Sequence, residues 1–213
     1  AEKLQVYSTS TIPVKVREKA LKKDSSLKAI DITVFGKFNE FASSLKSSKP
    51  KFLITPAQFP HYHPDYKAVY QFTKNDEATF KFLVLSLQDK KSLKDIATAS
   101  VGIVDELGRK NTSSFVKKNI GDFKRIKRVT KTDDLMPLLV LENADFIIIR
   151  PENYNSIKAK FTTQTYLAGE SKEIHYPVIC VLKDTSETEI KKIGKISPMT
   201  IKSLGFDQIR ELK

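Results

Sequence analysis

The chain alternates from one end to the other between short apolar segments and longer amphipathic ones. The apolar segments are rich in β-branched and aromatic residues, as in residues 30–35 and 145–149, a pattern typical of buried strands. Between them, apolar residues recur at helical spacing, as in residues 38–47, where they fall on one helix face. Strands that alternate with helices predict an α/β fold whose sheets are mostly parallel.

The same pattern predicts the individual elements. We expect strands at residues 4–8, 30–35, 52–55, 68–72, 79–88, 100–104, 126–130, 145–149, 161–167 and 176–182. We expect helices at residues 13–27, 38–47, 92–96, 113–119, 133–142, 187–196 and from 198 or 199 towards 212. Residues 57–66 contain two prolines and two histidines and are predicted to form a loop, and Pro151 is expected to turn the chain away. Two similar β-α-β units, at residues 4–55 and 100–149, indicate two lobes built to one plan.

Composition narrows the class of partner. The 213 residues carry 37 Lys and Arg against 25 Asp and Glu, a formal net charge of +12 that attracts anions. Apolar runs such as Phe146–Ile149 are far shorter than the ~20 residues that span a bilayer, so we expect no membrane insertion. The chain opens Ala1-Glu2-Lys3 without a leader, and we expect either a processed mature protein or a trimmed one. Cys180 lies in an apolar strand pattern and is interpreted as a buried hydrophobe.

The densest run of positive charge is Lys124-Arg125-Ile126-Lys127-Arg128. Its alternation with apolar positions suits an edge strand. No aromatic residues are interleaved with it, as single-stranded nucleic-acid binding requires, so we expect no nucleic acid among the partners.

Three local patterns resemble one known family. They are Phe35-Gly36-Lys37-Phe38 followed by residues 49–56; residues 92–96 followed by 101–105, Gly108 and 111–114; and residues 135–142 followed by 143–146. The order of elements around them is similar to the type 2 periplasmic solute-binding proteins, closest to the branch that binds phosphate and phosphonate for ABC transporters. The chain departs from the family at Arg109-Lys110 and at the histidine-containing loop.

The resemblance implies two lobes with a ligand cleft between them and no cofactor. Lobe I would comprise residues 1–85 and 171–213 and lobe II residues 86–170, with hinge crossovers near residues 82–90 and 165–174. A ligand would shift the equilibrium between open and closed forms, which a membrane partner reads. The resemblance also implies a periplasmic location after signal-peptide removal, and we expect a monomer.

Polar residues follow the predicted strands at the points where a ligand of an open α/β sheet binds. Helix starts offer unpaired N–H groups and the positive end of the helix dipole, so turns rich in Ser and Thr can hold anions. The candidate ligand-binding residues are Ser8, Thr9, Ser10, Gly36, Lys37, Thr55, Arg109, Asn111, Thr112, Ser113 and Ser114. The alternative is that each Ser/Thr cluster only caps its own helix and that Lys37 and Arg109 are merely solvated.

No other site is favoured. His61 and His63 could ligate a metal with Asp65, but a loop that contains histidines is more often only a loop, and we predict no metal. The sequence contains no G-x-S-x-G, G-x-x-x-x-G-K-[ST] or G-x-G-x-x-G motif, and we predict no catalytic residues.

The sequence therefore predicts a protein that binds a small anion, such as phosphate or phosphonate, outside the cytoplasm for ABC-type import or sensing. It would work with a membrane permease or sensor. The alternative is a sensory or protein-interaction module that keeps the fold without transport, and binding of a panel of oxyanions would separate the two.

Overall fold

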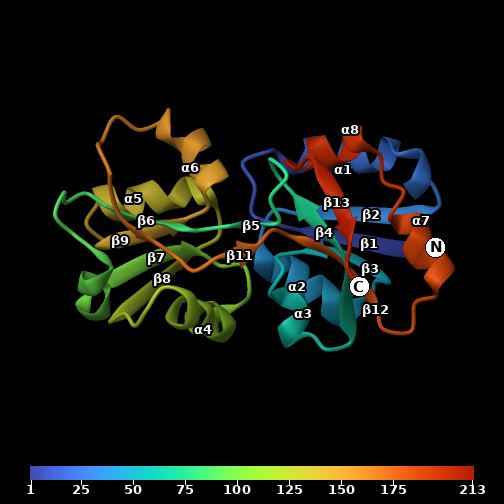
Figure 1. Ribbon diagram of the computed structural model, residues 1–213, viewed down its shortest axis with the longest axis horizontal. Coiled ribbons are helices and arrows are strands. Elements are labelled where there is room, and N and C mark those ends of the chain that lie inside the picture. The colour runs from blue at the N-terminus through green and yellow to red at the C-terminus, as the bar shows by residue number, and fades with distance from the viewer. The chain divides into compact units, whose positions relative to one another are not determined.

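The computed structural model describes residues 1–213, which form two compact units (Figure 1). Unit 1 comprises Ala1–Thr79 and His175–Lys213, and unit 2 comprises Phe80–Ile174. The chain thus passes from one unit to the other between residues 79 and 80 and returns between residues 174 and 175. The crossovers were expected near residues 82–90 and 165–174. Short strands β5 (Thr79–Phe80) and β11 (Ile174–His175) pair with each other at these points.

Unit 1 is built on a six-stranded sheet in the order β13-β4-β12-β3-β1-β2. Its strands are β1 (Glu2–Tyr7), β2 (Ile30–Phe35), β3 (Phe52–Thr55), β4 (Tyr66–Thr73), β12 (Val178–Leu182) and β13 (Gln208–Glu211). Strand β1 is parallel to β2 and β3, whereas β12 and β13 pair antiparallel with their neighbours. Strand β12 lies between two other strands, and its residues Val178 to Val181 are buried on both faces of the sheet.

Helices cover both faces of this sheet. They are α1 (Val14–Lys23), η1 (Ser25–Leu27), α2 (Phe38–Ser47), α3 (Phe59–Tyr62), α7 (Glu187–Ile193) and α8 (Pro198–Ser203). Figure 1 shows α1, α7 and α8 on one face and α2 and α3 on the other. The face under α2 is filled by aromatic rings, with Phe41 5.7 Å from Tyr7 and 5.4 Å from Phe59 between ring centroids.

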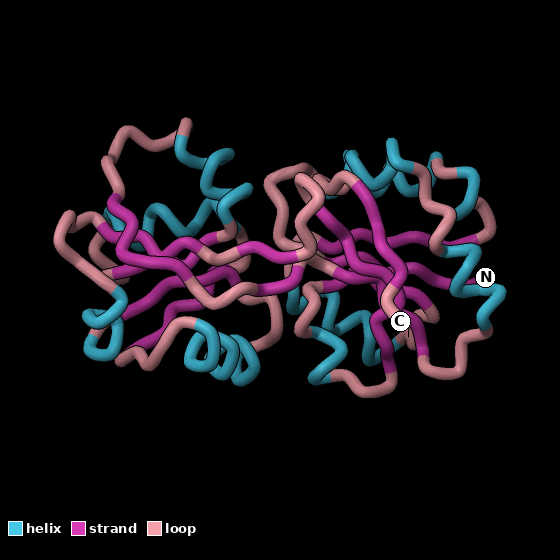
Figure 2. The backbone as a smooth tube through the Cα atoms, in the orientation of Figure 1, coloured by secondary structure: helices cyan, strands magenta, loops and turns pink.

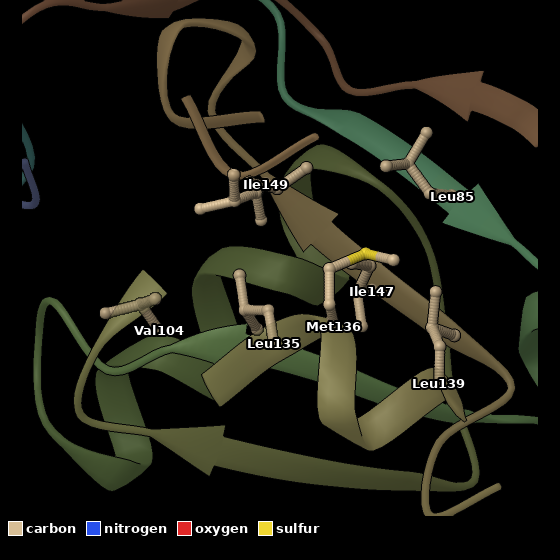
Figure 3. Packing of buried hydrophobic residues seen from close by; sticks show 8 residues of the cluster. Leu85, Val104, Leu135, Met136, Leu139, Ile147 and Ile149 are labelled. Carbon is tan, nitrogen blue, oxygen red and sulfur yellow. The ribbon is translucent and has the colours of Figure 1, made fainter. Parts of the chain in front are cut away.

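Unit 2 has a five-stranded sheet in the order β10-β6-β9-β7-β8. Its strands are β6 (Leu83–Ser86), β7 (Ser100–Val104), β8 (Arg125–Val129), β9 (Phe146–Ile149) and β10 (Tyr166–Glu170), and its helices are η2 (Leu93–Thr98), α4 (Arg109–Asn119), η3 (Thr132–Asp134), α5 (Leu135–Val140) and α6 (Pro151–Lys158). Strand β7 is parallel to β8 and β9. Strand β6 pairs antiparallel with β9, and β10 pairs antiparallel with β6. Figure 2 shows that helices lie on both faces of this sheet too. On one face, Leu135, Met136 and Leu139 of α5 pack on the sheet around Ile147 (Figure 3).

The two units share a plan, as the repeated β-α-β pattern predicts. In each, a central strand is flanked by two parallel strands that follow it in sequence: β3-β1-β2 in unit 1 and β9-β7-β8 in unit 2. The α/β class is confirmed. The parallel arrangement holds for these three strands of each sheet, and the remaining pairs are antiparallel.

Several expected elements were wrong. The loop predicted at 57–66 contains α3, and the single strand at 79–88 is broken into β5 and β6. The helix predicted from residue 113 begins at Arg109, and the strand predicted at 161–167 begins only at Tyr166. The chain forms α6 from Pro151, because proline suits the first turn of a helix. The last predicted helix ends at Ser203 and is followed by edge strand β13.

Candidate functional site

The predicted residues of unit 1 follow its parallel strands. Strands β1 and β2 are in register with Tyr7 opposite Phe35, so the segments that begin at Ser8 and Gly36 leave the sheet side by side. A side chain at Gly36 would contact Val14 at the start of α1, its Cβ lying 3.2 Å from Val14 Cγ2. The starts of α1 and α2 therefore lie close to each other at the carboxyl end of this sheet.

The segment after β1 is held by a buried arginine that the sequence reading missed. Arg17 of α1 is 3% exposed, and it donates from Nη1 to the Ser8 carbonyl at 3.3 Å and from Nε to the Ile12 carbonyl at 3.1 Å. Within the turn, Ser10 Oγ accepts a hydrogen bond from Ile12 N–H at 3.0 Å. The hydroxyl of Ser10 thus shapes the turn two residues ahead of it and does not cap α1.

Thr55 differs from the other candidates in unit 1. It is fully buried, and its hydroxyl lies 3.6 Å from Cys180 Sγ on the neighbouring strand β12. Thr55 is therefore part of the sheet interior, and its side chain does not line a surface.

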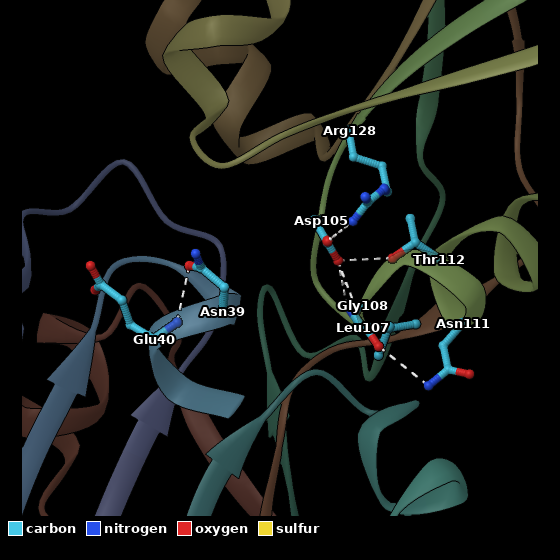
Figure 4. Close-up of polar contacts among 8 residues, drawn as sticks. All are labelled: Asn39, Glu40, Asp105, Leu107, Gly108, Asn111, Thr112 and Arg128. Carbon is cyan, nitrogen blue, oxygen red and sulfur yellow. Dashed lines mark hydrogen bonds and ion pairs between the residues drawn. The ribbon is translucent and has the colours of Figure 1, made fainter. Parts of the chain in front are cut away.

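The predicted residues of unit 2 surround the start of α4, where Asp105 organises the turn after β7 (Figure 4). Its Oδ1 accepts hydrogen bonds from Gly108 N–H at 2.7 Å, Leu107 N–H at 3.3 Å and the Thr112 hydroxyl at 3.1 Å. Its Oδ2 pairs with Arg128 of the adjacent strand β8. One carboxylate thus fixes the turn, the helix and the edge strand together.

A second carboxylate next to it forms a buried ion pair. Glu106 binds Arg150, the residue after β9, through two hydrogen bonds of 2.9 and 2.8 Å. Arg150 is 3% exposed, and its guanidinium lies 4.6 Å from the ring centroid of Phe80 and 5.2 Å from that of Phe82. The sequence signal was a charged residue close after each of two buried strands: Glu106 two residues after β7 and Arg150 directly after β9.

The four polar residues predicted at the helix start lie inside α4, because the helix begins at Arg109. Thr112 is buried and donates to Asp105, and Asn111 donates to the Leu107 carbonyl at 3.3 Å. Ser113 is half-buried and Ser114 is exposed. Arg109 and Lys110 occupy the first turn instead, and both are exposed.

Three helices begin at the carboxyl ends of parallel strands without a side-chain cap: α1 after Pro13, α2 after Lys37 and α4 after Gly108. The residue before each helix supplies no side-chain cap, and the alternative that the Ser/Thr clusters only cap these helices stays a prediction. The first N–H groups of a helix lack intrahelical partners and carry the positive end of its dipole. In α2, Asn39 Oδ1 accepts one of them, the Glu40 N–H, at 3.0 Å (Figure 4). No acidic residue lies in the first turn of α1 or α4, so these starts favour anions.

The histidines lie elsewhere in unit 1. His63 stacks on Phe59, with ring centroids 3.9 Å apart, and burial lowers its pKa. It borders an open hollow of about 490 Å³ near the end of α2 and the start of β4, at the opposite end of the sheet. No three His, Cys, Asp or Glu side chains are placed together to hold a metal ion. None of the helices combines the length and apolar character that crossing a bilayer requires.

Comparison with known proteins identifies the fold. No family model and no curated protein sequence matches this chain. Among solved structures, XAC2383 from Xanthomonas citri bound to chloride aligns over 100% of this chain and 91% of its own, with a TM-score of 0.74 and 10% identity. PhnD1 from Prochlorococcus marinus in complex with methylphosphonate aligns over 100% and 92%, with a TM-score of 0.72 and 12% identity.

Other similar structures bind a different class of ligand. Arginine-bound ArgBP from T. maritima aligns over 95% of both chains, with a TM-score of 0.59 and 14% identity. At these identities the likeness concerns the fold and leaves the ligand open. The chain has the fold of the type 2 periplasmic solute-binding proteins, and its structural neighbours include a binding protein component of an ABC phosphonate transporter from Pseudomonas aeruginosa.

Proposed function

We propose that this protein binds a small oxyanion, such as phosphate or a phosphonate, outside the cytoplasm and delivers it to an ABC-type importer or a membrane sensor. The observation that carries the proposal is the set of three uncapped helix starts, each at the carboxyl end of a parallel strand. Ligands of open α/β sheets bind beyond this end of the strands. The net charge of +12 adds a long-range attraction for anions.

In unit 1, the proposed ligand contacts are the turn of Ser8, Thr9 and Ser10 and the start of α2 at Gly36 and Lys37. Buried Arg17 holds the segment at both ends, because it donates to the carbonyls of Ser8 and Ile12. Lys37 is the residue before α2 and would add a point charge to the N–H groups of the helix. A segment that is held in place before the ligand arrives loses less entropy when the ligand binds.

In unit 2, the proposed contacts are the first N–H groups of α4 and the guanidinium of Arg109, which can hold an oxyanion through two hydrogen bonds. Thr112 supports this site indirectly by holding Asp105. The Asp105 carboxylate already accepts the Gly108 N–H and its negative charge repels an anion, so the ligand would bind the N–H groups of α4 that follow Gly108. Thr55 is left out of the proposed site because it is buried.

The test measures equilibrium binding of phosphate, methylphosphonate, sulfate and arginine by calorimetry and by the shift in thermal unfolding. An oxyanion at 100 times its Kd should stabilise the protein by about 2.7 kcal/mol. Lys37→Gln should weaken that binding about tenfold, since it removes a charge-assisted contact. Lys28→Gln, an exposed lysine elsewhere in unit 1, should leave it unchanged.

Three outcomes would contradict the proposal. Binding of arginine alone would assign the protein to the amino-acid binders. Equal effects of Lys37→Gln and Lys28→Gln would reduce the role of Lys37 to net charge. No binding by any of the four compounds would favour a sensory or interaction module that keeps the fold without transport.

A further inference from the structure

The positive charge of the chain is concentrated in one short stretch of unit 2. Residues 109–131 contain nine Lys and Arg residues and a single carboxylate, Asp122, so the stretch carries a formal charge of +8 out of the +12 of the whole chain. The other 190 residues together carry only +4. We call this stretch, which comprises α4, the turn after it and β8, the basic margin.

The basic margin is continuous in space as well as in sequence. Strand β8 is the edge strand of the unit 2 sheet, and α4 connects it to its neighbour β7. Figure 1 shows α4 beside β8 along this edge. The end of α4 contacts the segment before β8, with Lys117 Nζ 5.5 Å from the ring centroid of Phe123.

Its charges are available to a partner. All nine cationic residues are exposed, and they are Arg109, Lys110, Lys117, Lys118, Lys124, Arg125, Lys127, Arg128 and Lys131. Only Arg128 forms an ion pair, with Asp105. The other eight form no ion pair, and their like charges repel one another, which destabilises the folded chain unless a partner neutralises them.

We propose that the basic margin binds the surface of an anionic lipid bilayer. The margin lacks exposed large apolar residues, whereas protein–protein interfaces depend on buried aromatic and apolar anchors. It also lacks exposed aromatic rings on which bases could stack. Six of its nine cations are lysines, which act as point charges without the fixed geometry of an arginine fork.

These features match a diffuse anionic surface. A lipid bilayer with anionic headgroups needs only a high local density of positive charge, and each Lys or Arg near such a surface contributes about 1 kcal/mol. Without apolar residues the protein adsorbs to the headgroups and does not insert, so the binding is reversible and weakens with salt. Unpaired lysines along β8 also protect this sheet edge from pairing with another strand.

The experiment compares two variants of the full chain with the same net charge. The margin variant carries Lys→Gln changes at Lys117, Lys118, Lys124 and Lys127. The control variant carries the same change at Lys23, Lys28, Lys67 and Lys191, which are exposed, lie in unit 1 and form no ion pair. Binding is measured by co-sedimentation with vesicles of phosphatidylcholine alone and with vesicles of equal parts phosphatidylcholine and phosphatidylglycerol.

We expect wild type and control to bind the anionic vesicles but not the neutral ones, and to be released by high salt. The margin variant should bind at least about tenfold more weakly than the control, a conservative value for four lysines. Equal losses in the two variants would overturn the proposal, as would no binding of the wild type to anionic vesicles. Tighter binding to duplex DNA than to vesicles at the same salt concentration would assign the margin to nucleic acid instead. The margin variant should keep the oxyanion response of the wild type, so this proposal and the proposed function can fail separately.

Discussion

Replacing Glu106 with Gln should destabilise unit 2 strongly. The guanidinium of Arg150 is 3% exposed and the Glu106 side chain 12%, and two hydrogen bonds of 2.9 and 2.8 Å join them. Gln preserves the shape of the side chain but removes the charge and one of the two acceptors. The arginine is then left as a buried cation whose main counter-charge is gone, which costs about 3–5 kcal/mol.

We expect the lower end of that range, about 3 kcal/mol, because Phe80 and Phe82 still cover the guanidinium and continue to stabilise it. In urea, with an m-value of about 1.5 kcal/mol/M, this corresponds to a midpoint lower by about 2 M. The measurement is equilibrium unfolding followed by far-ultraviolet circular dichroism, with Glu173→Gln as the matched control. Glu173 is exposed in the same unit, and its replacement should change stability by less than about 0.5 kcal/mol.

The double variant Glu106→Leu with Arg150→Met separates charge from packing. Replacing both partners of a buried pair by apolar residues is often close to neutral, so the double variant should be more stable than Glu106→Gln alone. A loss below about 1 kcal/mol for Glu106→Gln, or a double variant less stable than the single one, would refute this account of the pair.

Three further predictions concern single residues. Burial alone would raise the pKa of Asp24, but hydrogen bonds from groups that include Ser26 and Thr200 outweigh it and lower the pKa from 3.8 to about 2. The stability that this carboxylate contributes is present above about pH 4 and is lost as the pH falls towards 2. Asp24→Asn should therefore flatten the pH dependence of the unfolding free energy between about pH 4 and about pH 2. An unchanged profile would exclude Asp24 as the source of that dependence. Gly108 precedes α4 with φ +90° and ψ 164°, a backbone conformation that essentially only glycine adopts. Gly108→Ala should therefore lower the free energy of unfolding in urea by about 1–3 kcal/mol, and an unchanged value would mean that the turn relaxes. Burial raises the pKa of the Cys180 thiol to about 12, so a thiol reagent should label it only as the protein unfolds, and fast labelling of the folded protein would contradict its burial.

Elements were predictable from sequence where the local pattern and the tertiary environment agree. The strands at 30–35, 52–55 and 100–104 and the helix at 38–47 have the bounds that the sequence predicts. Strand β13 was missed because its residues are mostly polar and exposed, and its place is determined by pairing with β4, more than a hundred residues earlier in the chain. Local periodicity cannot carry that information.

For the candidate site, the sequence indicated the segments after the strands but not how their side chains pair. The run of Asn111 to Ser114 suggested a helix start, yet the helix begins at Arg109, after a glycine with a positive φ. The sequence shows Glu106 and Arg150 only as charged residues that follow apolar strands. It cannot show that they pair, because the two positions are 44 residues apart. That the predicted residues of the two units hold one ligand remains a prediction.

The position of β12 has a consequence for synthesis on the ribosome. This strand lies inside the sheet of unit 1, between β3 and β4, although it follows the whole of unit 2 in the chain. Unit 2 is continuous and can fold as soon as it emerges, whereas the first 79 residues must wait with an unfilled gap in their sheet. During that interval the facing edges of β3 and β4 lack a partner, and they are the surfaces on which chaperones or premature association would act.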